Sequence, residues 1–214
     1  MIAVAKRGFS LIEVMTVMVL SGLVAGVIVN IIIGAWRSQL VQEAISKAQG
    51  EARFVVNTIS TEAHQSSSVI NSLVSGPNTY VSNASSVVLR LDSINSNGDI
   101  ITGIDYLIFR QNPNDLKITE RVVVADPASA RVAWPGSLTL SGATAALEIH
   151  YFDSAGNELE PLARASPFKV YAAPVAGDLT PTSRMVITST ITKTAQLQSF
   201  SRNFEQTVSL RNKQ

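Results

Sequence analysis

The sequence predicts an α+β fold in which one long N-terminal helix packs on an antiparallel β-sheet domain. Residues 14–36 form an apolar stretch without a single charged residue, and the first proline of the chain is Pro77. From Ser85 onward, apolar and polar residues alternate in short runs that are separated by Gly, Asn, Asp and Pro, a pattern typical of strands joined by turns. The period therefore changes from helical to strand once along the chain, which predicts a helix followed by one sheet-rich domain.

The apolar stretch is long enough to cross a membrane, since a spanning helix needs roughly 20 residues. Within lipid a single segment satisfies its backbone hydrogen bonds only as a helix. Lys6 and Arg7 precede the stretch, and basic residues stay on the cytoplasmic side of a bacterial-type anchor. We therefore expect a single pass through the inner (cytoplasmic) membrane, with the N-terminus cytoplasmic and the residues after Trp36 outside.

Two features separate this stretch from an ordinary anchor. A cleavage after Gly8 removes a short basic leader and leaves the apolar stretch on the mature chain, unlike a secretory signal, which is cut behind its apolar region. Glu13 is an acid among apolar residues, where a carboxylate is costly without a partner. The same cleavage places a new amine on Phe9, four residues before Glu13 and on the same helix face.

The segment Gly8-Phe9-Ser10-Leu11-Ile12-Glu13 resembles the processing signal of the type IV pilin and pseudopilin superfamily. The resemblance implies a pilin-like fold, cleavage between Gly8 and Phe9 by a prepilin peptidase, and N-methylation of Phe9. It also implies that Glu13 pairs with the Phe9 amine of an adjacent subunit in a filament. The expected partners are then other pilin or pseudopilin subunits and the peptidase, with the membrane crossed once.

The helix is expected to continue beyond the membrane as an amphipathic segment, because apolar residues recur at three- and four-residue spacing from Ala44 to Ala63. The predicted organisation is a leader over 1–8, a transmembrane or filament-core helix over 9–36, the amphipathic second half of that helix over 37–66, and a β-rich extracytoplasmic domain over 67–214. Gly22 and Gly26 have the spacing that lets membrane helices approach closely, although glycine is also common in such helices without that role.

Alternation and turn residues predict the strands of the outer domain. Residues 66–84 and 126–136 are expected as irregular connections, and a third strand is expected to include Leu116 and Val122–Val124. The other expected strands are 87–92, 104–109, 137–140, 145–152, 168–172, 184–194 and 207–210.

Composition and motifs argue against most enzymes and cofactor sites. The chain has 214 residues, a net charge of +1, no cysteine and two histidines, so it has neither disulfides nor the basic character of a nucleic-acid-binding domain, and no nucleic acid contact is expected. His64 and His150 lack zinc-site spacing and are interpreted as structural. No nucleotide-binding or hydrolase motif is present, which predicts a chain that is not an enzyme and carries no cofactor or metal.

Calcium is the remaining metal hypothesis. Asn95, Asn97 and Asp99 surround Gly98, and Asp153, Asn157 and Glu158 surround Gly156. Oxygen ligands of this kind suit calcium, but the same residues are favoured in turns for backbone reasons alone. Turn chemistry is the preferred interpretation.

The leading function hypothesis is a structural minor subunit, a minor pilin, of a type IV pilus that takes part in filament priming and assembly. The order of the outer elements, including Tyr151–Gly156 and the Thr-rich stretch 184–194, is similar to PilW-type minor pilins and to J-type minor pseudopilins of type II secretion, so a minor pseudopilin is the alternative. An anchored adhesin or sensor that never polymerises is the alternative of another class. The sequence does not distinguish adhesion, motility, DNA uptake and secretion.

Overall fold

The computed structural model describes residues 10–112, 114–116, 119–131, 134–159, 179–195 and 198–211. The chain divides into two compact units, Met1–Glu43 and Ala44–Gln214. The predicted α+β layout is confirmed, because one long helix, α1 (Leu11–Gln65), precedes antiparallel sheets.

In the first unit, α1 presents its apolar side chains to the surroundings. From Leu11 to Leu40, between 42% and 81% of the surface of each large apolar residue is exposed, so nothing among the described residues covers them. These residues are Leu11, Ile12, Val14, Met15, Val17, Met18, Val19, Leu20, Leu23, Val24, Val27, Ile28, Val29, Ile31, Ile32, Ile33, Trp36 and Leu40.

In the second unit, the strands form two larger sheets and a hairpin. The five-stranded sheet has the order β1-β4-β5-β6-β7, the four-stranded sheet has the order β11-β10-β8-β9, and β2 pairs with β3. All pairs are antiparallel. The strands are β1 (Ser68–Val69), β2 (Ser72–Ser75), β3 (Asn78–Val81), β4 (Ser86–Ile94), β5 (Ile100–Gln111), β6 (Thr119–Val124), β7 (Trp134–Thr139), β8 (Thr144–Phe152), β9 (Glu158–Leu159), β10 (Arg184–Ala195) and β11 (Gln198–Ser209).

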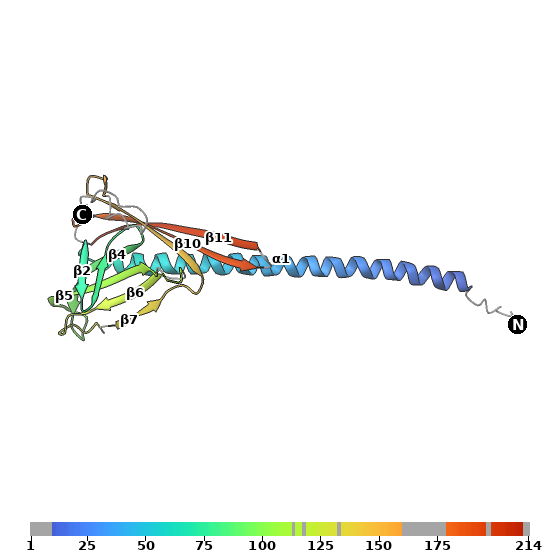
Figure 1. Cartoon of the computed structure of the whole chain (residues 1–214), viewed down its shortest axis with the longest axis horizontal. Coiled ribbons are helices and arrows are strands. Elements are labelled where there is room, and N and C mark those ends of the chain that lie inside the picture. The colour runs from blue at the N-terminus through green and yellow to red at the C-terminus, as the bar shows by residue number, and fades with distance from the viewer. Residues whose placement is uncertain are drawn as a thin grey trace. The chain divides into compact units, whose positions relative to one another are not determined.

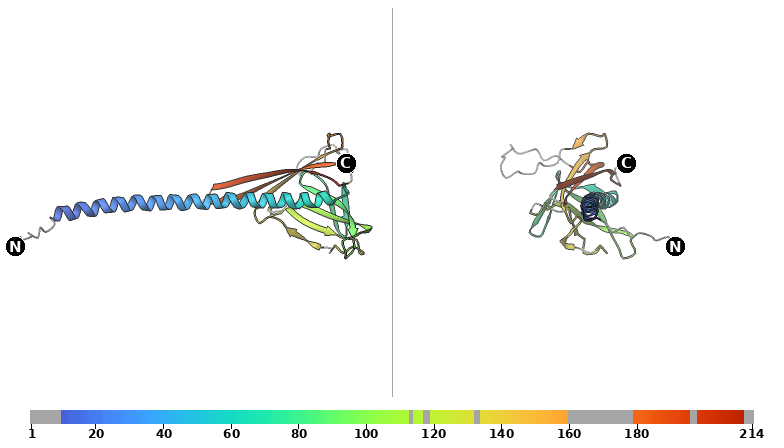
Figure 2. Two further views of the ribbon diagram at one scale, coloured as in Figure 1. Left: turned by 180° about the vertical axis from the view of Figure 1, so that it is seen from behind. Right: turned by 90° about the vertical axis from the view of Figure 1, so that its right-hand side faces the viewer.

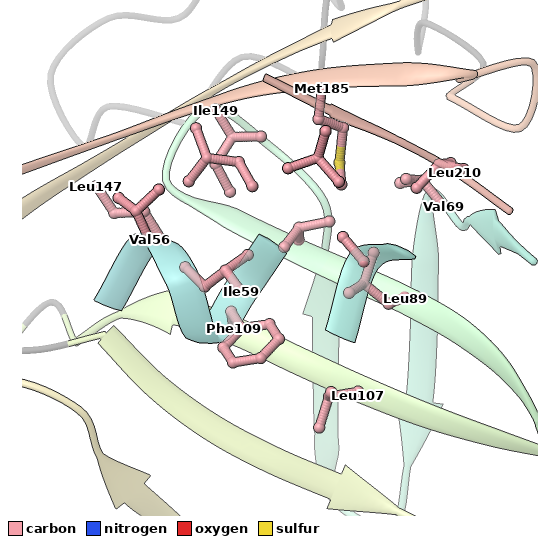
Figure 3. Close-up of a cluster of buried hydrophobic side chains, with 14 of the residues drawn as sticks. Val56, Ile59, Val69, Leu89, Leu107, Phe109, Leu147, Ile149, Met185 and Leu210 are labelled. Atoms are coloured by element: carbon pink, nitrogen blue, oxygen red, sulfur yellow. The ribbon is translucent and has the colours of Figure 1, made fainter. Parts of the chain in front are cut away.

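The C-terminal part of α1 lies between the two larger sheets, with β10 and β11 on one side and β5, β6 and β7 on the other (Figures 1 and 2). Val56 and Ile59 of α1 are fully buried and lie between Phe109 of the five-stranded sheet and Ile149 of the four-stranded sheet (Figure 3). The predicted amphipathic stripe is therefore present. Its buried members are Ala48, Ala52, Val55, Val56, Ile59, Ser60 and Ala63.

Two ion pairs attach this part of α1 to both sheets. Glu51 Oε1 lies 2.5 Å from Lys193 Nζ on β10, and Glu62 Oε1 lies 2.9 Å from Arg121 Nη2 on β6. All four side chains are one-fifth to one-third exposed, so water screens each ion pair only in part. Each pair helps to orient α1 against the sheet that it contacts.

The strand predictions were partly wrong. Residues 66–84 are not a plain connection, because they contain β1, β2 and β3. Gly76, with φ of 58°, begins the two-residue link between β2 and β3, a position where hairpin turns require glycine. This hairpin covers the outer face of the five-stranded sheet, where Tyr80 packs on a cluster of Val88, Ile108 and Val122.

Three further strand predictions differ from the structure. Leu116 lies in a turn with φ of 52°, outside β6. Residues 126–136 are not irregular throughout, since β7 begins at Trp134. The last strand is much longer than 207–210, because β11 begins at Gln198. The strand expected at 168–172 lies outside the described residues.

A buried carboxylate organises one end of the five-stranded sheet. Asp105 of β5 is 1% exposed and accepts four hydrogen bonds of 2.7–3.0 Å. The donors are Ser93 Oγ, the Asp126 backbone N–H, Ser129 Oγ and Arg131 Nη1. Burial alone would raise the pKa of Asp105, but these donors outweigh it and hold the pKa below its ordinary value.

Gly103 is required by the same cluster. The β4–β5 register shifts between Asp92 and Ile94, where Ser93 alone lies opposite three residues of β5, Ile101 to Gly103. A Cβ on Gly103 would lie 2.9 Å from Ser93 Oγ and 3.1 Å from Asp126 Cγ, and its φ is 156°. Only glycine fits without moving groups that surround Asp105.

We predict that Asp105→Asn destabilises the protein by about 3 kcal/mol, because it leaves Arg131 without its charged partner in a buried site. The contribution of a carboxyl with a lowered pKa is present above its unfolded pKa and is lost as the pH falls through the folded value. Thermal melts of the full chain in detergent micelles from pH 7 to pH 3 should therefore show a smaller decrease of the melting temperature with falling pH in the variant than in the wild type. Exposed Asp99→Asn is the control, with an expected change within about 0.5 kcal/mol; equal effects of the two variants would contradict the assignment.

We predict that Gly103→Ala costs about 1–3 kcal/mol, since a methyl group is forced into a filled space. Gly142→Ala is the matched control, because a Cβ there meets nothing within 4 Å. Urea unfolding of both variants measures the difference. A neutral Gly103→Ala would show that Ser93 and Asp126 move aside freely.

Candidate functional site

The start of α1 is held by a reciprocal capping box. Ser10 Oγ accepts a hydrogen bond from the Glu13 backbone N–H at 3.2 Å, and Glu13 Oε2 accepts one from the Ser10 backbone N–H at 2.9 Å. This arrangement satisfies two backbone donors that a helix N-terminus otherwise leaves open. The carboxylate also lies in the first turn, where the helix dipole favours negative charge.

The capping box changes the interpretation of Glu13. The sequence predicts that Glu13 needs a cationic partner, the Phe9 amine of its own chain or of an adjacent subunit, whereas the structure also gives it a hydrogen bond to the Ser10 N–H within its first turn. The local sequence signal for this capping box is Ser-x-x-Glu ahead of an apolar run. A carboxylate has about four acceptor positions, so one capping bond leaves capacity for an external cation.

Gly8 and Phe9, the residues of the predicted cleavage and methylation, lie outside the described residues. Glu13 lies four residues after Phe9, the predicted new terminus, in the first turn of α1 that Ser10 caps. The pairing of Glu13 with a Phe9 amine stays a prediction.

Gly22 and Gly26 lie on the exposed part of α1. A Cβ built on either glycine meets no atom of the chain within 4 Å. Packing within this chain therefore does not require glycine at these two positions. Each glycine weakens a helix by up to about 1 kcal/mol relative to alanine, and their proposed use in helix–helix contact stays a prediction.

Among the described residues, α1 is the one helix long and apolar enough to cross a membrane, by length and composition. Its most apolar window is entirely unburied within the chain. Single-pass anchoring through the N-terminal helix is consistent with this surface.

The two histidines occupy different places. His64 lies exposed in the last turn of α1. His150 of β8 lies between two carboxylates, with Nδ1 at 2.5 Å from Glu158 Oε1 and Nε2 at 3.2 Å from Glu148 Oε1. The hydrogen bond with Glu158 is the main reason that the pKa of His150 is raised. In the part of the chain that the structure describes, no three His, Cys, Asp or Glu residues are placed to hold a metal ion.

The two calcium candidates share one turn geometry. Asn95 Oδ1 accepts the backbone N–H groups of Asn97 and Asp99, and Asp153 Oδ1 accepts those of Ala155 and Asn157. Gly98 and Gly156 both have φ of 88°. Asn95 Oδ1 and Asp153 Oδ1 thus accept hydrogen bonds within the turns, which is the turn chemistry that these residue types favour.

A cavity of about 460 Å³ lies beside the C-terminal end of α1, lined in part by Glu62, Arg121 and Arg131. Arg121 is paired with Glu62, and Arg131 is paired with Asp105. Both guanidinium groups are therefore engaged in ion pairs with residues of the fold.

The N-terminal segment matches a known family model. Residues 4–29 match the model described as "Prokaryotic N-terminal methylation motif", the type IV prepilin signal, and the chain fits the type IV pilin and pseudopilin superfamily. No curated protein and no solved structure matches the chain.

We predict that Ser10→Ala frays the first turn of α1, because it removes the acceptor for the Glu13 N–H. Loss of such a cap costs about 1 kcal/mol, which corresponds to roughly a fivefold faster amide exchange. Hydrogen exchange of the Glu13 amide in detergent micelles measures this. Ser21→Ala, the same change within the helix, is the control and should leave the Glu13 amide unchanged; an unchanged rate in Ser10→Ala would contradict the cap.

Proposed function

We propose that this chain is a structural minor subunit, a minor pilin, of a type IV pilus and takes part in filament priming and assembly. The observation that carries the proposal is the prepilin signal over residues 4–29, followed directly by a helix whose apolar side chains have no cover within the chain. A surface of this kind requires lipid before assembly and neighbouring helices after it.

The proposed maturation begins in the inner membrane, with the N-terminus in the cytoplasm. A prepilin peptidase cuts between Gly8 and Phe9, residues 1–8 leave as the leader, and the new Phe9 amine is methylated. Residues 9–36 then serve as the membrane and filament-core helix, residues 37–66 as its amphipathic continuation, and residues 67–214 as the extracytoplasmic domain.

Assembly is proposed to use the charge of Glu13. In the free subunit, Glu13 caps its own helix through Oε2. The carboxylate retains acceptor positions, so a Phe9 amine from an adjacent subunit can approach the same end of α1. In a poorly solvated filament core such a pair is much stronger than in water, and it would set the axial register of adjacent helices.

A minor pseudopilin of a type II secretion filament fits the same observations, because the helix, the prepilin signal and the assembly step are common to both. An anchored adhesin or sensor that does not polymerise is the remaining candidate. This candidate differs from a filament subunit in one respect, because a protein that does not polymerise does not require the charge of Glu13 for assembly.

Glu13→Gln and Glu13→Ala together test the mechanism. Glutamine can retain both hydrogen bonds of the capping box. Alanine loses the charge and the acceptor for the Ser10 N–H, and keeps only the backbone bond to Ser10 Oγ. If the charge sets register, both variants stay in the membrane and both enter filaments at least about tenfold less than wild type, a change equivalent to about 1.4 kcal/mol. Quantification in sheared filaments against the membrane fraction measures this.

The control for this pair is Ser10→Ala, which loses the cap but keeps the charge. It is expected to enter filaments at close to the wild-type level. Normal incorporation of Glu13→Gln would contradict a role for the charge, and normal incorporation of all three variants would contradict the assembly mechanism.

A further inference from the structure

One sheet edge differs from the other three. The two larger sheets end in β1, β7, β9 and β11, and exposed edges are usually shortened, bulged or interrupted by proline, because open backbone groups invite pairing with another chain. β1 and β9 have two residues each. β7 has six residues, including Pro135, and a register shift against β6.

Among the described residues, β11 has none of these protections. It has 12 residues without proline, and all 12 pair with β10 in one unbroken register. The charged residues of this strand are Arg202 and Glu205. A long, unbroken edge of this kind is a template for an added strand.

The hydrogen bonds at the end of β11 show which residues face the open side. The Leu210 N–H donates to Ser183 O, on the β10 side, and the Arg211 N–H donates outward to Ser66 O. This alternation, carried back along the strand, directs the backbone groups of Ser201, Asn203, Glu205 and Thr207 outward. In agreement with it, Arg202 Nη1 donates to Ser201 O at 3.1 Å.

We propose that the outer edge of β11 is a docking site for an extended strand of a neighbouring subunit, and that this strand carries an acidic side chain facing Arg202. The proposal rests on the proposed function, because it assumes an assembly of anchored subunits. The backbone of the edge fixes the class of occupant, since a row of alternating N–H and C=O groups is matched by an extended polypeptide.

Charge defines the face of that strand. Arg53 of α1 lies over the Phe204 ring, 5.5 Å from its centroid. Arg202 projects to the same side of β11 as Phe204, two residues away, and both arginines are exposed. Two positive charges thus lie on this face of β11, and a carboxylate on the same face of an added strand complements them. On the opposite face, β11 presents hydroxyl groups, with Ser201 bonded to Thr192 at 2.8 Å.

A second β11 is not the proposed occupant. Within the second unit β11 runs in the same direction as α1. The start of β11 lies near Glu51, because Phe200 pairs with Lys193, which binds Glu51. Further along, Phe204 contacts Arg53, and after the end of β11 the Arg211 N–H binds Ser66 O. Antiparallel pairing of two β11 strands would make the two α1 segments antiparallel. Subunits anchored in one membrane by their N-terminal helices do not have that arrangement.

Hydrogen exchange at single-residue resolution tests the edge directly. The full chain is compared in native membranes, where neighbouring subunits are present, and as a purified monomer in detergent micelles. We expect the Ser201, Asn203, Glu205 and Thr207 amides to exchange at least about tenfold more slowly in membranes. The inward amides of Arg202 and Phe204 should not change, and equal exchange of the outward amides in both samples would overturn the proposal.

Asn203→Pro is the corresponding variant. Proline removes one outward N–H and is tolerated on edge strands, while Asn203→Ala keeps the N–H and serves as the matched control. We expect at least about tenfold less protection of the neighbouring outward amides in Asn203→Pro, with a melting temperature close to that of Asn203→Ala. Unchanged protection in a folded Asn203→Pro would overturn the proposal, and if this variant fails to fold, the wild-type exchange comparison decides alone.

Cross-linking identifies the occupant. The chain has no cysteine, so Ser201→Cys carries the only thiol and can be labelled with a benzophenone maleimide in membranes. Adducts to an extended segment of another subunit support the proposal, and adducts to a second β11 overturn it. The amount of the protein in filaments is measured on the same samples. If the β11 edge is protected but the protein is absent from filaments, the proposed function is contradicted. If the protein is present in filaments but the β11 edge is unprotected, only the docking site is contradicted.

Discussion

The structure depends on how the apolar surface of α1 is covered. Burial of a Val, Leu or Ile side chain contributes about 1.5–3 kcal/mol, and the first unit leaves a whole row of such side chains exposed. The described residues do not supply that stabilisation, which lipid or neighbouring helices provide in the proposed function. The prepilin signal over residues 4–29 coincides with this uncovered part, which connects the physical requirement to the pilin and pseudopilin superfamily.

The second unit covers the rest of α1 from both sides. Small residues such as Ala48 and Ala52 let β8 and β10 approach the helix closely, through Ala145 and Ile191. Larger residues further along fill the space between the two sheets, and the ion pairs of Glu51 and Glu62 fix the helix to one sheet each. Asp105 then holds the segment that contains Ser129 and Arg131 against the edge of this core.

Sequence patterns predicted the features that have a local signal. The helix, its buried stripe, most of β4, β8 and β10 and half of β5 follow from hydrophobic period and turn residues. The first half of β11 was missed because Arg202 lies between the partly buried Phe200 and Phe204 and interrupts the apolar alternation of that face. The Asp105 cluster has no sequence signal, because its donors lie 12 to 26 residues away. The capping box of Ser10 and Glu13 did have a local signal, and so did the β2–β3 hairpin at Gly76.

The central proposal is that maturation gives this chain a new, charged N-terminal amine beside Glu13, at the start of an apolar helix. Intact-mass measurement of the membrane-bound protein, from cells with an active prepilin peptidase, tests it most directly. The account predicts a chain that begins at Phe9 and carries one additional methyl group. A membrane form that still begins at Met1 would contradict it.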